Sequence, residues 1–181
     1  GGPLPAATLC DAVEAALARW SASGCVRFVA ARSGDEAELV FAWRTGAHDA
    51  CPAFGVDPSV AHAGPVGPGT FVHFDAEREW SADGAHGLSL RQAALHELGH
   101  VLGLDHSSDE RAVMYPEPSA ERDRLGASDL AGLHALYGGG ASGDGDLTLT
   151  DTQGRALVLP RVAPPELSTC AAFDTDGDGD D

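Results

Sequence analysis

A stretch of eleven residues places strict demands on the fold of this chain: His96-Glu97-Leu98-Gly99-His100-Val101-Leu102-Gly103-Leu104-Asp105-His106. His96 and His100 are four residues apart, so in a helix their side chains lie one turn apart on the same face. Gly103 can adopt a positive φ, which lets the chain end the helix and turn sharply. We therefore expect His106 to return to the place where the two helical histidines point.

Three convergent imidazoles predict a catalytic zinc centre. Three protein ligands leave one coordination position open, which is typical of catalytic rather than structural zinc. Glu97 follows His96 directly and can hold a water molecule beside the metal without being a ligand itself. A helix that carries three histidines by chance is the alternative, but signals for a helix start and end lie where such a site requires them.

The zinc-binding stretch begins within a strongly predicted helix. Ser89 and Gln92 form a capping box, S-x-x-Q, which predicts the helix start. One face then carries apolar side chains at helical spacing: Leu90, Ala94, Leu98, Val101 and Leu102. Gly103 predicts the helix end.

The rest of the chain predicts a mixture of helices and strands. Further helices are expected over residues 5–20 and from Ser128 to Tyr137. Three short apolar runs predict strands at 26–30, 37–43 and 70–74. A Gly-rich linker follows at 138–145, and a hairpin is expected over 147–159 with its turn at Gln153-Gly154.

The charge of the chain excludes several classes of partner. With 28 acidic and 11 basic residues, the net charge is −17. Binding to nucleic acid or to an anionic membrane surface needs a basic patch, so we expect neither. No apolar run approaches the ~18 residues of a transmembrane helix, so no membrane insertion is expected. The abundance of Ala, Gly, Asp and Arg, with no Lys, Ile or Asn, favours a GC-rich bacterial genome.

The four cysteines indicate an oxidising compartment. Cys10, Cys25, Cys51 and Cys170 are widely spaced and form no C-x-x-C motif, so they do not predict a zinc ribbon. An even number in an acidic, lysine-free chain fits one or two disulfides of a secreted protein. Buried free thiols are the alternative.

These motifs together resemble those of the matrixins, a family of metzincin zinc proteases. Ala112-Val113-Met114-Tyr115-Pro116 resembles the Met-turn, with Met114 beneath the metal and the tyrosine directly after it. The resemblance covers residues 5–138. It implies an α+β metzincin catalytic domain at 1–138, with three helices, a twisted mixed β-sheet and the family's first strand missing ahead of Leu4. Residues 139–181 would then form the linker and an acidic tail.

The resemblance also implies further metals. Val60-Ala61-His62-Ala63 and Val72-His73-Phe74-Asp75 resemble the matrixin segments that hold a structural zinc and calcium. The expected zinc ligands are His48, Asp49, His62 and His73, and the expected calcium ligands are Asp75 and Glu77. His48 and Asp49 are adjacent, whereas matrixins separate this pair by one residue. Polar loop histidines are the alternative.

The implied function is that of a secreted, extracellular endopeptidase. It would hydrolyse peptide bonds of a protein or peptide substrate through a zinc-activated water, with Glu97 as general base. The strand at 70–74, with Val72, is expected to form the cleft edge to which a peptide adds as a strand. By resemblance, Pro116 and Pro118 would wall the S1′ pocket. A non-catalytic binding or adhesion module stabilised by zinc or calcium is the alternative, against which the intact Glu97 argues.

Two further expectations concern the cysteines and the tail. Matrixin topology places Cys10 and Cys51 at the same end of the sheet, which favours a disulfide between them. The tail matches the first half of an EF-hand-type calcium loop, with Asp174, Asp176, Asp178 and Asp180 as possible ligands. The bidentate Glu of such a loop would lie beyond residue 181, and an acidic disordered tail is the alternative.

Overall fold

The fold was analysed in a computed structural model of the chain. It describes residues 2–26, 28, 39–49, 51–56, 59–64, 69–137, 148–150 and 156–158. Most of the strand expected at 26–30 lies outside these residues. The calcium loop expected at Asp174, Asp176, Asp178 and Asp180 also lies outside them.

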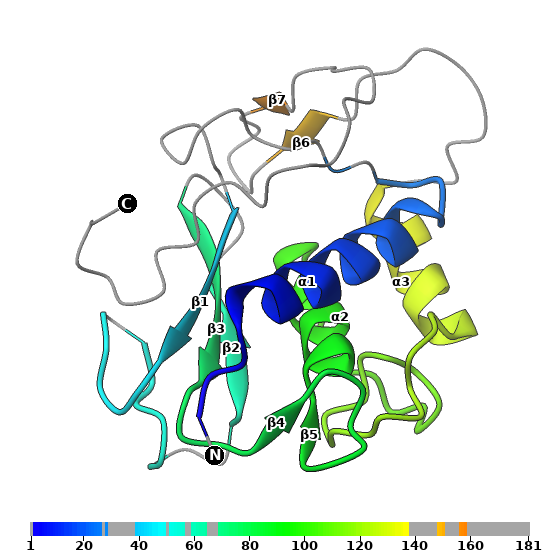
Figure 1. Cartoon of the computed structure of the whole chain (residues 1–181). Helices are drawn as coiled ribbons and strands as arrows, with labels where there is room; N and C mark the ends of the chain where they lie inside the picture. The colour runs from blue at the N-terminus through cyan, green and yellow to red at the C-terminus, as the bar shows by residue number, and fades with distance from the viewer. Residues whose placement is uncertain are drawn as a thin grey trace.

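The described chain contains three helices and a small mixed sheet, as predicted (Figure 1). The helices are α1 (Ala6–Ser21), α2 (Leu90–Val101) and α3 (Ala127–Tyr137). The sheet contains β1 (Leu39–Arg44), β2 (Ala61–Ala63) and β3 (Thr70–Asp75). Two short pairs complete the fold: β4 (Trp80–Ser81) pairs with β5 (Leu88–Ser89), and β6 (Thr148–Thr150) with β7 (Ala156–Val158). The antiparallel β6–β7 pair agrees with the strands of the predicted hairpin. Its turn at Gln153-Gly154 and the predicted linker at 138–145 lie outside the described residues.

The strand order is β1-β3-β2, which corrects one expectation. β3 pairs in parallel with β1 and antiparallel with β2, so it is the central strand of the sheet. Val72 on β3 lies between Phe41 and Ala63 and is fully buried. The prediction that residues 70–74 form the cleft edge was wrong, because both sides of this strand are already paired. The edge strands of the sheet, as far as the structure describes it, are β1 and β2, and β2 is the one that borders the cleft.

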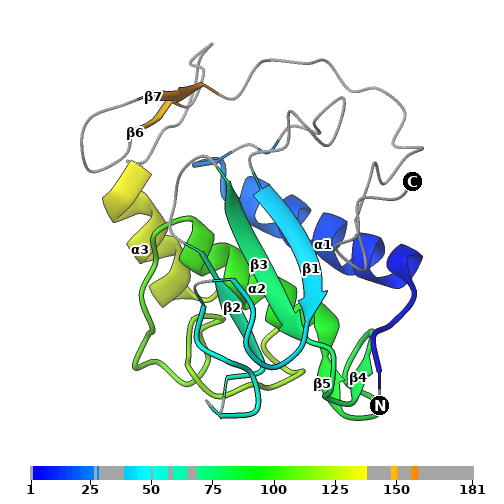
Figure 2. The same ribbon diagram turned by 90° about the vertical axis from the view of Figure 1, so that its left-hand side faces the viewer.

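Helices α1 and α2 lie side by side against one face of the sheet (Figures 1 and 2). The indole Nε1 of Trp20 on α1 donates a hydrogen bond of 2.9 Å to the carbonyl of Leu95 on α2. The core between helices and sheet includes all three tryptophans, Trp20, Trp43 and Trp80, together with Leu9, Val72, Phe74, Leu95 and Leu98. This packing holds α2 rigidly in the centre of the domain.

The ends of α2 match the sequence signals. Ser89 is the N-cap, and its Oγ accepts a hydrogen bond of 3.3 Å from the backbone N–H of Gln92. Gly103 adopts φ 85° and reverses the chain after the helix. α3 begins one residue before Ser128, which is therefore not the cap; its hydroxyl instead hydrogen-bonds that of Ser107 at 2.8 Å.

The cysteines correct a second expectation. Cys10 is disulfide-bonded, whereas Cys51 and Cys25 are free thiols, so the expected Cys10–Cys51 bridge was wrong. Cys51 instead lies against His73 in the sheet. Within the described part of the chain, no helix has both the length and the apolar character needed to cross a bilayer.

Candidate functional site

The three predicted zinc ligands converge. The ring centroids of His96 and His100 are 4.8 Å apart, and that of His106 lies 5.3 Å and 4.9 Å from them. One nitrogen from each ring lies within 4.8 Å of the others. The first two rings come from one face of α2, and the turn at Gly103 returns the third, as the sequence predicted.

Backbone carbonyls orient the two helical rings. His96 Nδ1 donates to the carbonyl of Val113 at 2.7 Å, and His100 Nδ1 donates to that of Leu104 at 2.9 Å. Since a carbonyl can only accept, the neutral rings carry their proton on Nδ1 and leave the Nε2 lone pair for a metal. Burial lowers the pKa of His96 to about 4 and also lowers the pKa of His100. Both rings are therefore neutral at pH 7, which fits zinc.

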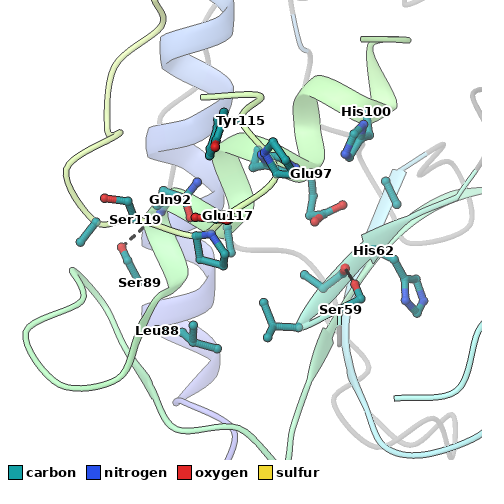
Figure 3. A pocket seen from close by; sticks show the side chains of 18 of the residues that line it. Ser59, His62, Leu88, Ser89, Gln92, Glu97, His100, Tyr115, Glu117 and Ser119 are labelled. Carbon is teal, nitrogen blue, oxygen red and sulfur yellow. Dashed lines mark hydrogen bonds between the residues drawn. The ribbon is translucent and has the colours of Figure 1, made fainter. Parts of the chain in front are cut away.

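Glu97 lies beside these rings and points into the cleft (Figure 3). Only 6% of its surface is exposed, and burial raises the pKa of its carboxyl to about 8, although a backbone hydrogen bond from Ala63 favours the charged form. Its Oε2 is buried and has no hydrogen-bond partner within the described part of the chain. A cation at the three imidazoles would favour ionised Glu97, because an opposite charge nearby stabilises a carboxylate.

The Met-turn lies directly beneath α2. A Cβ added to Gly99 would lie 2.1 Å from Met114 Sδ and 3.0 Å from Trp20 Cζ2, so only glycine allows this close packing. Met114 is 1% exposed. Met114 therefore lies against the helix that carries His96 and His100.

Asp129 on α3 anchors the Met-turn, a role that the sequence interpretation missed. Its buried carboxylate accepts hydrogen bonds from the backbone N–H groups of Val113 (2.8 Å), Met114 (3.0 Å) and Gly126 (2.7 Å). Val113 in turn holds the ring of His96. The only sequence signal was an acidic residue in the first turn of the last helix, which more often interacts with its own helix N-terminus.

A cleft of about 780 Å³ opens beside the three histidines (Figure 3). Edge strand β2 lines it with Ala61 and Ala63, and the segment after the Met-turn lines it with Pro116 and Pro118. Both prolines therefore line the cleft. Val72 is not in the cleft, because it is buried in the central strand.

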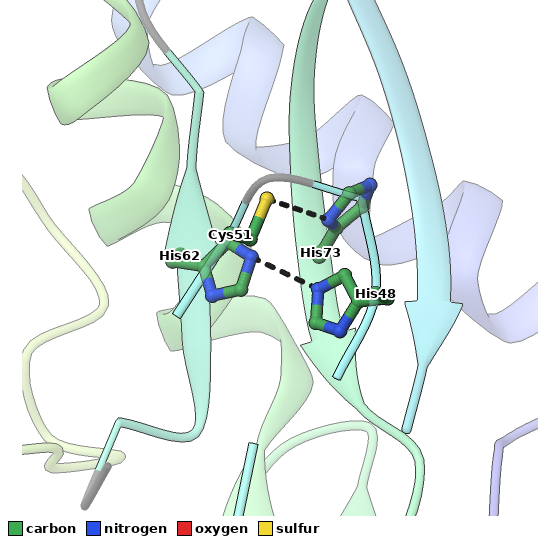
Figure 4. Close-up of side chains that lie close together, drawn as sticks. All are labelled: His48, Cys51, His62 and His73. Carbon is green, nitrogen blue, oxygen red and sulfur yellow. Dashed lines mark hydrogen bonds between the residues drawn. The ribbon is translucent and has the colours of Figure 1, made fainter. Parts of the chain in front are cut away.

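A second group of metal-binding side chains lies on the sheet (Figure 4). The register of β2 and β3 puts His62 directly opposite His73, and the loop after β1 adds His48 and Cys51. His48 Nε2 is 3.2 Å from His62 Nε2, and Cys51 Sγ is 3.9 Å from His73 Nδ1. Burial lowers the pKa of His73 to about 4 and raises the pKa of the Cys51 thiol. The sequence interpretation missed Cys51, although the spacing H-x-x-C was a usable signal.

The other expected ligands lie elsewhere. Asp49 is outside this group, and its carboxylate faces Arg44 at 3.9 Å. Asp75 is 1% exposed and accepts hydrogen bonds from the N–H of Glu77 (3.0 Å) and from Arg78 Nε (3.1 Å). Among the described residues, only the two histidine-rich groups bring three or more potential ligands together.

Comparison with known proteins agrees with this geometry. The matrixin family profile matches residues 2–138. The chain belongs to the matrixin family. It is 36% identical to stromelysin-2 from Rattus norvegicus over 172 residues, which cover 91% of this chain and 36% of that protein. It is 39% identical to matrix metalloproteinase-20 from Homo sapiens over 133 residues, which cover 70% of this chain and 27% of that protein.

A bacterial protein is also similar to this matrixin. Karilysin from Tannerella forsythia is 33% identical over 134 residues, covering 71% of this chain and 28% of that protein. The chain spans about a third of the length of the curated relatives it matches. The family confirms the predicted α+β metzincin fold and the resemblance to matrixins.

Proposed function

We propose that this matrixin is a zinc-dependent endopeptidase in which Glu97 is the general base. The observation that carries this proposal is the buried, unpartnered Oε2 of Glu97 beside three convergent histidines in an open cleft. A module that used zinc only for stability would have no use for such an oxygen, because a buried polar atom without a partner is costly.

The residues around the three convergent histidines have different roles in the proposed reaction. His96, His100 and His106 would hold the zinc, which when bound supplies a Lewis acid for a water molecule and the scissile carbonyl. Glu97 removes a proton from the attacking water and passes it to the leaving amine. Carbonyls of Val113 and Leu104 keep two of the imidazoles in the tautomer that binds metal.

The cleft favours an extended peptide as substrate. β2 is an edge strand, so an incoming peptide can pair with Ala61–Ala63 as a further strand. Pro116 and Pro118 also line the cleft and would shape the S1′ pocket. The disulfide at Cys10 supports secretion, since disulfides persist in oxidising compartments.

We further propose two structural metal sites. A second zinc would bind His48, His62 and His73, which the sheet and its neighbouring loop bring together. Calcium would bind near Asp75 and Glu77, at the turn that follows β3.

Substitution of Glu97 by Gln tests the catalytic proposal. The amide keeps the shape and loses the base, so cleavage of casein should fall ~10²–10⁴-fold. Zinc content should stay at the wild-type level, because Glu97 is not a ligand. Glu14→Gln on the exposed face of α1 is the matched control and should leave cleavage unchanged. Cleavage by Glu97→Gln at the wild-type rate would refute the assigned role.

A further inference from the structure

We propose that the thiolate of Cys51, and not the carboxylate of Asp49, is the fourth ligand of the second zinc. The site would then be a closed set of three imidazoles and one sulfur. This inference rests on the second zinc proposed above and does not depend on peptidase activity.

A tight turn directs Cys51 inward. The N–H of Cys51 donates a hydrogen bond of 3.2 Å to the carbonyl of His48, so the two residues are the ends of a four-residue turn. Asp49 occupies this turn with φ 45°, a left-handed conformation that Asp tolerates better than most residues. The turn brings the side chains of His48 and Cys51 to the same place (Figure 4).

The same turn directs Asp49 away from the site. Its side chain is 62% exposed and contacts the guanidinium of Arg44 at 3.9 Å. In the matrixin pattern the acidic ligand lies two residues after the histidine, and that position is Ala50, which offers no ligand atom. Cys51, one residue further along, is therefore the donor that this chain offers in its place.

Two distances between the donor atoms are close to those of a tetrahedral zinc site, and all four donors lie within 4.8 Å of one another. Zinc bonds of about 2.05 Å to nitrogen and about 2.3 Å to sulfur place neighbouring ligand atoms about 3.3 Å (N–N) and about 3.6 Å (N–S) apart. The pair His48 Nε2–His62 Nε2 is at 3.2 Å, and the pair Cys51 Sγ–His73 Nδ1 is at 3.9 Å. Only small side-chain shifts separate this arrangement from coordination geometry.

Aromatic packing fixes the imidazoles before any metal binds. Phe54 stacks on His62 with centroids 4.6 Å apart, and Phe71 stacks on His73 at 4.2 Å. His48 Nδ1 donates to the carbonyl of Gly46 at 3.0 Å, which leaves its Nε2 for the metal. Four protein ligands leave no open position, so this zinc would stabilise the fold rather than activate water.

Cobalt substitution tests the sulfur ligand directly. Co²⁺ replaces zinc with the same ligands, and a bound thiolate gives a charge-transfer band in the near ultraviolet. The His96→Ala variant of this chain, loaded with Co²⁺, isolates the second site, and we expect one bound ion with this band. Cys51→Ser should abolish the band and weaken metal retention against a chelator. Asp49→Ala and Cys25→Ala are the matched controls and should change neither.

The outcomes separate this inference from the proposals it builds on. A bound Co²⁺ without the band would overturn the sulfur ligand and leave the second metal site standing. Loss of the ion in Asp49→Ala would restore the carboxylate as ligand and also overturn it. If no second ion binds, both proposals fail, while casein cleavage remains a separate test of Glu97. If Cys51→Ser fails to fold, the presence or absence of the band in the His96→Ala protein with Cys51 intact still shows whether sulfur is a ligand.

Discussion

The two histidine-rich groups differ in how many donors they offer and in what surrounds them. The group on α2 and the loop that follows it has three donors, borders the cleft and lies beside the unpartnered Glu97. The group on the sheet has four donors and lies between Phe54 and Phe71. Histidine content alone would not tell the two apart. The number of protein ligands and a nearby base separate a site for chemistry from a site for stability.

The largest effect is expected when one ligand is removed from the group of His96, His100 and His106, which we call the open group because it has only three protein donors. His96→Ala should abolish casein cleavage and reduce zinc content from about two ions per chain to about one. His62→Ala should also remove one zinc, while the zinc at the open group remains. Elemental analysis of both variants gives the result. Loss of both ions in His96→Ala would show that the groups are not independent.

Acid should destabilise the metal-free protein through both groups. The pKa of His73 and of His96 is lowered to about 4 by burial, so between about pH 4 and 6.5 the unfolded chain binds more protons than the folded one. The contribution of these two histidines to stability is therefore fully present above pH 6.5 and decreases as the pH falls toward 4, whereas the raised pKa of Glu97 acts in the opposite direction. Each histidine contributes up to ~1.4 kcal/mol per pH unit in this window.

Urea unfolding of chelator-treated protein at several pH values measures this slope. His73→Gln and His96→Gln should each reduce it, because each removes one titrating group. The exposed His134 provides the control His134→Gln, which should not. If only one of these two substitutions reduces the pH dependence of the free energy of unfolding, acid acts through that histidine's group alone.

Asp129→Asn should weaken the open group alone. The amide can no longer accept from all three N–H groups that Asp129 now holds, so the free energy of unfolding should fall by ~2 kcal/mol. The Met-turn also carries the carbonyl that orients His96, so zinc affinity at the open group should fall as well. In chelator competition, this zinc should be released at a lower chelator concentration than in the wild type. The concentration that releases the second zinc should not change. Equal weakening of both would contradict the assigned role.

Calcium should have the smallest effect. A ligand that binds only the folded state at tenfold excess over its Kd stabilises it by ~1.4 kcal/mol. Thermal unfolding with calcium or a calcium-selective chelator should show this shift, and Glu77→Gln should reduce it. If Asp174→Asn in the tail abolishes the shift and Glu77→Gln does not, the calcium site near Asp75 is misplaced.

The sequence predicted α2 and its ligands well because that information is local. Helical spacing, the Ser89 cap and the turn at Gly103 are properties of adjacent residues, and together they place three rings at one point. The strand order was not predictable in this way, since it depends on pairing between distant segments. The edge strand β2 has only three residues, too few for a clear periodic pattern.

Cys51 shows the limit of arguing from a resemblance. The family pattern directed attention to Asp49 as a zinc ligand and to Cys10 as the partner of Cys51. The turn between His48 and Cys51 is set by the left-handed Asp49 and by a backbone hydrogen bond, and neither is visible in a pattern of spacings. The residue that departs from the family pattern is the one that the structure brings into the site.

The most direct test of the account is restoration of casein cleavage by zinc in metal-depleted protein. We expect the wild-type chain to be inactive after chelation and to recover when zinc is added. Glu97→Gln should bind the added zinc and stay inactive. Cleavage by the metal-free wild type, or recovery of Glu97→Gln to the wild-type rate, would contradict the claim that the open group and its buried glutamate carry the chemistry.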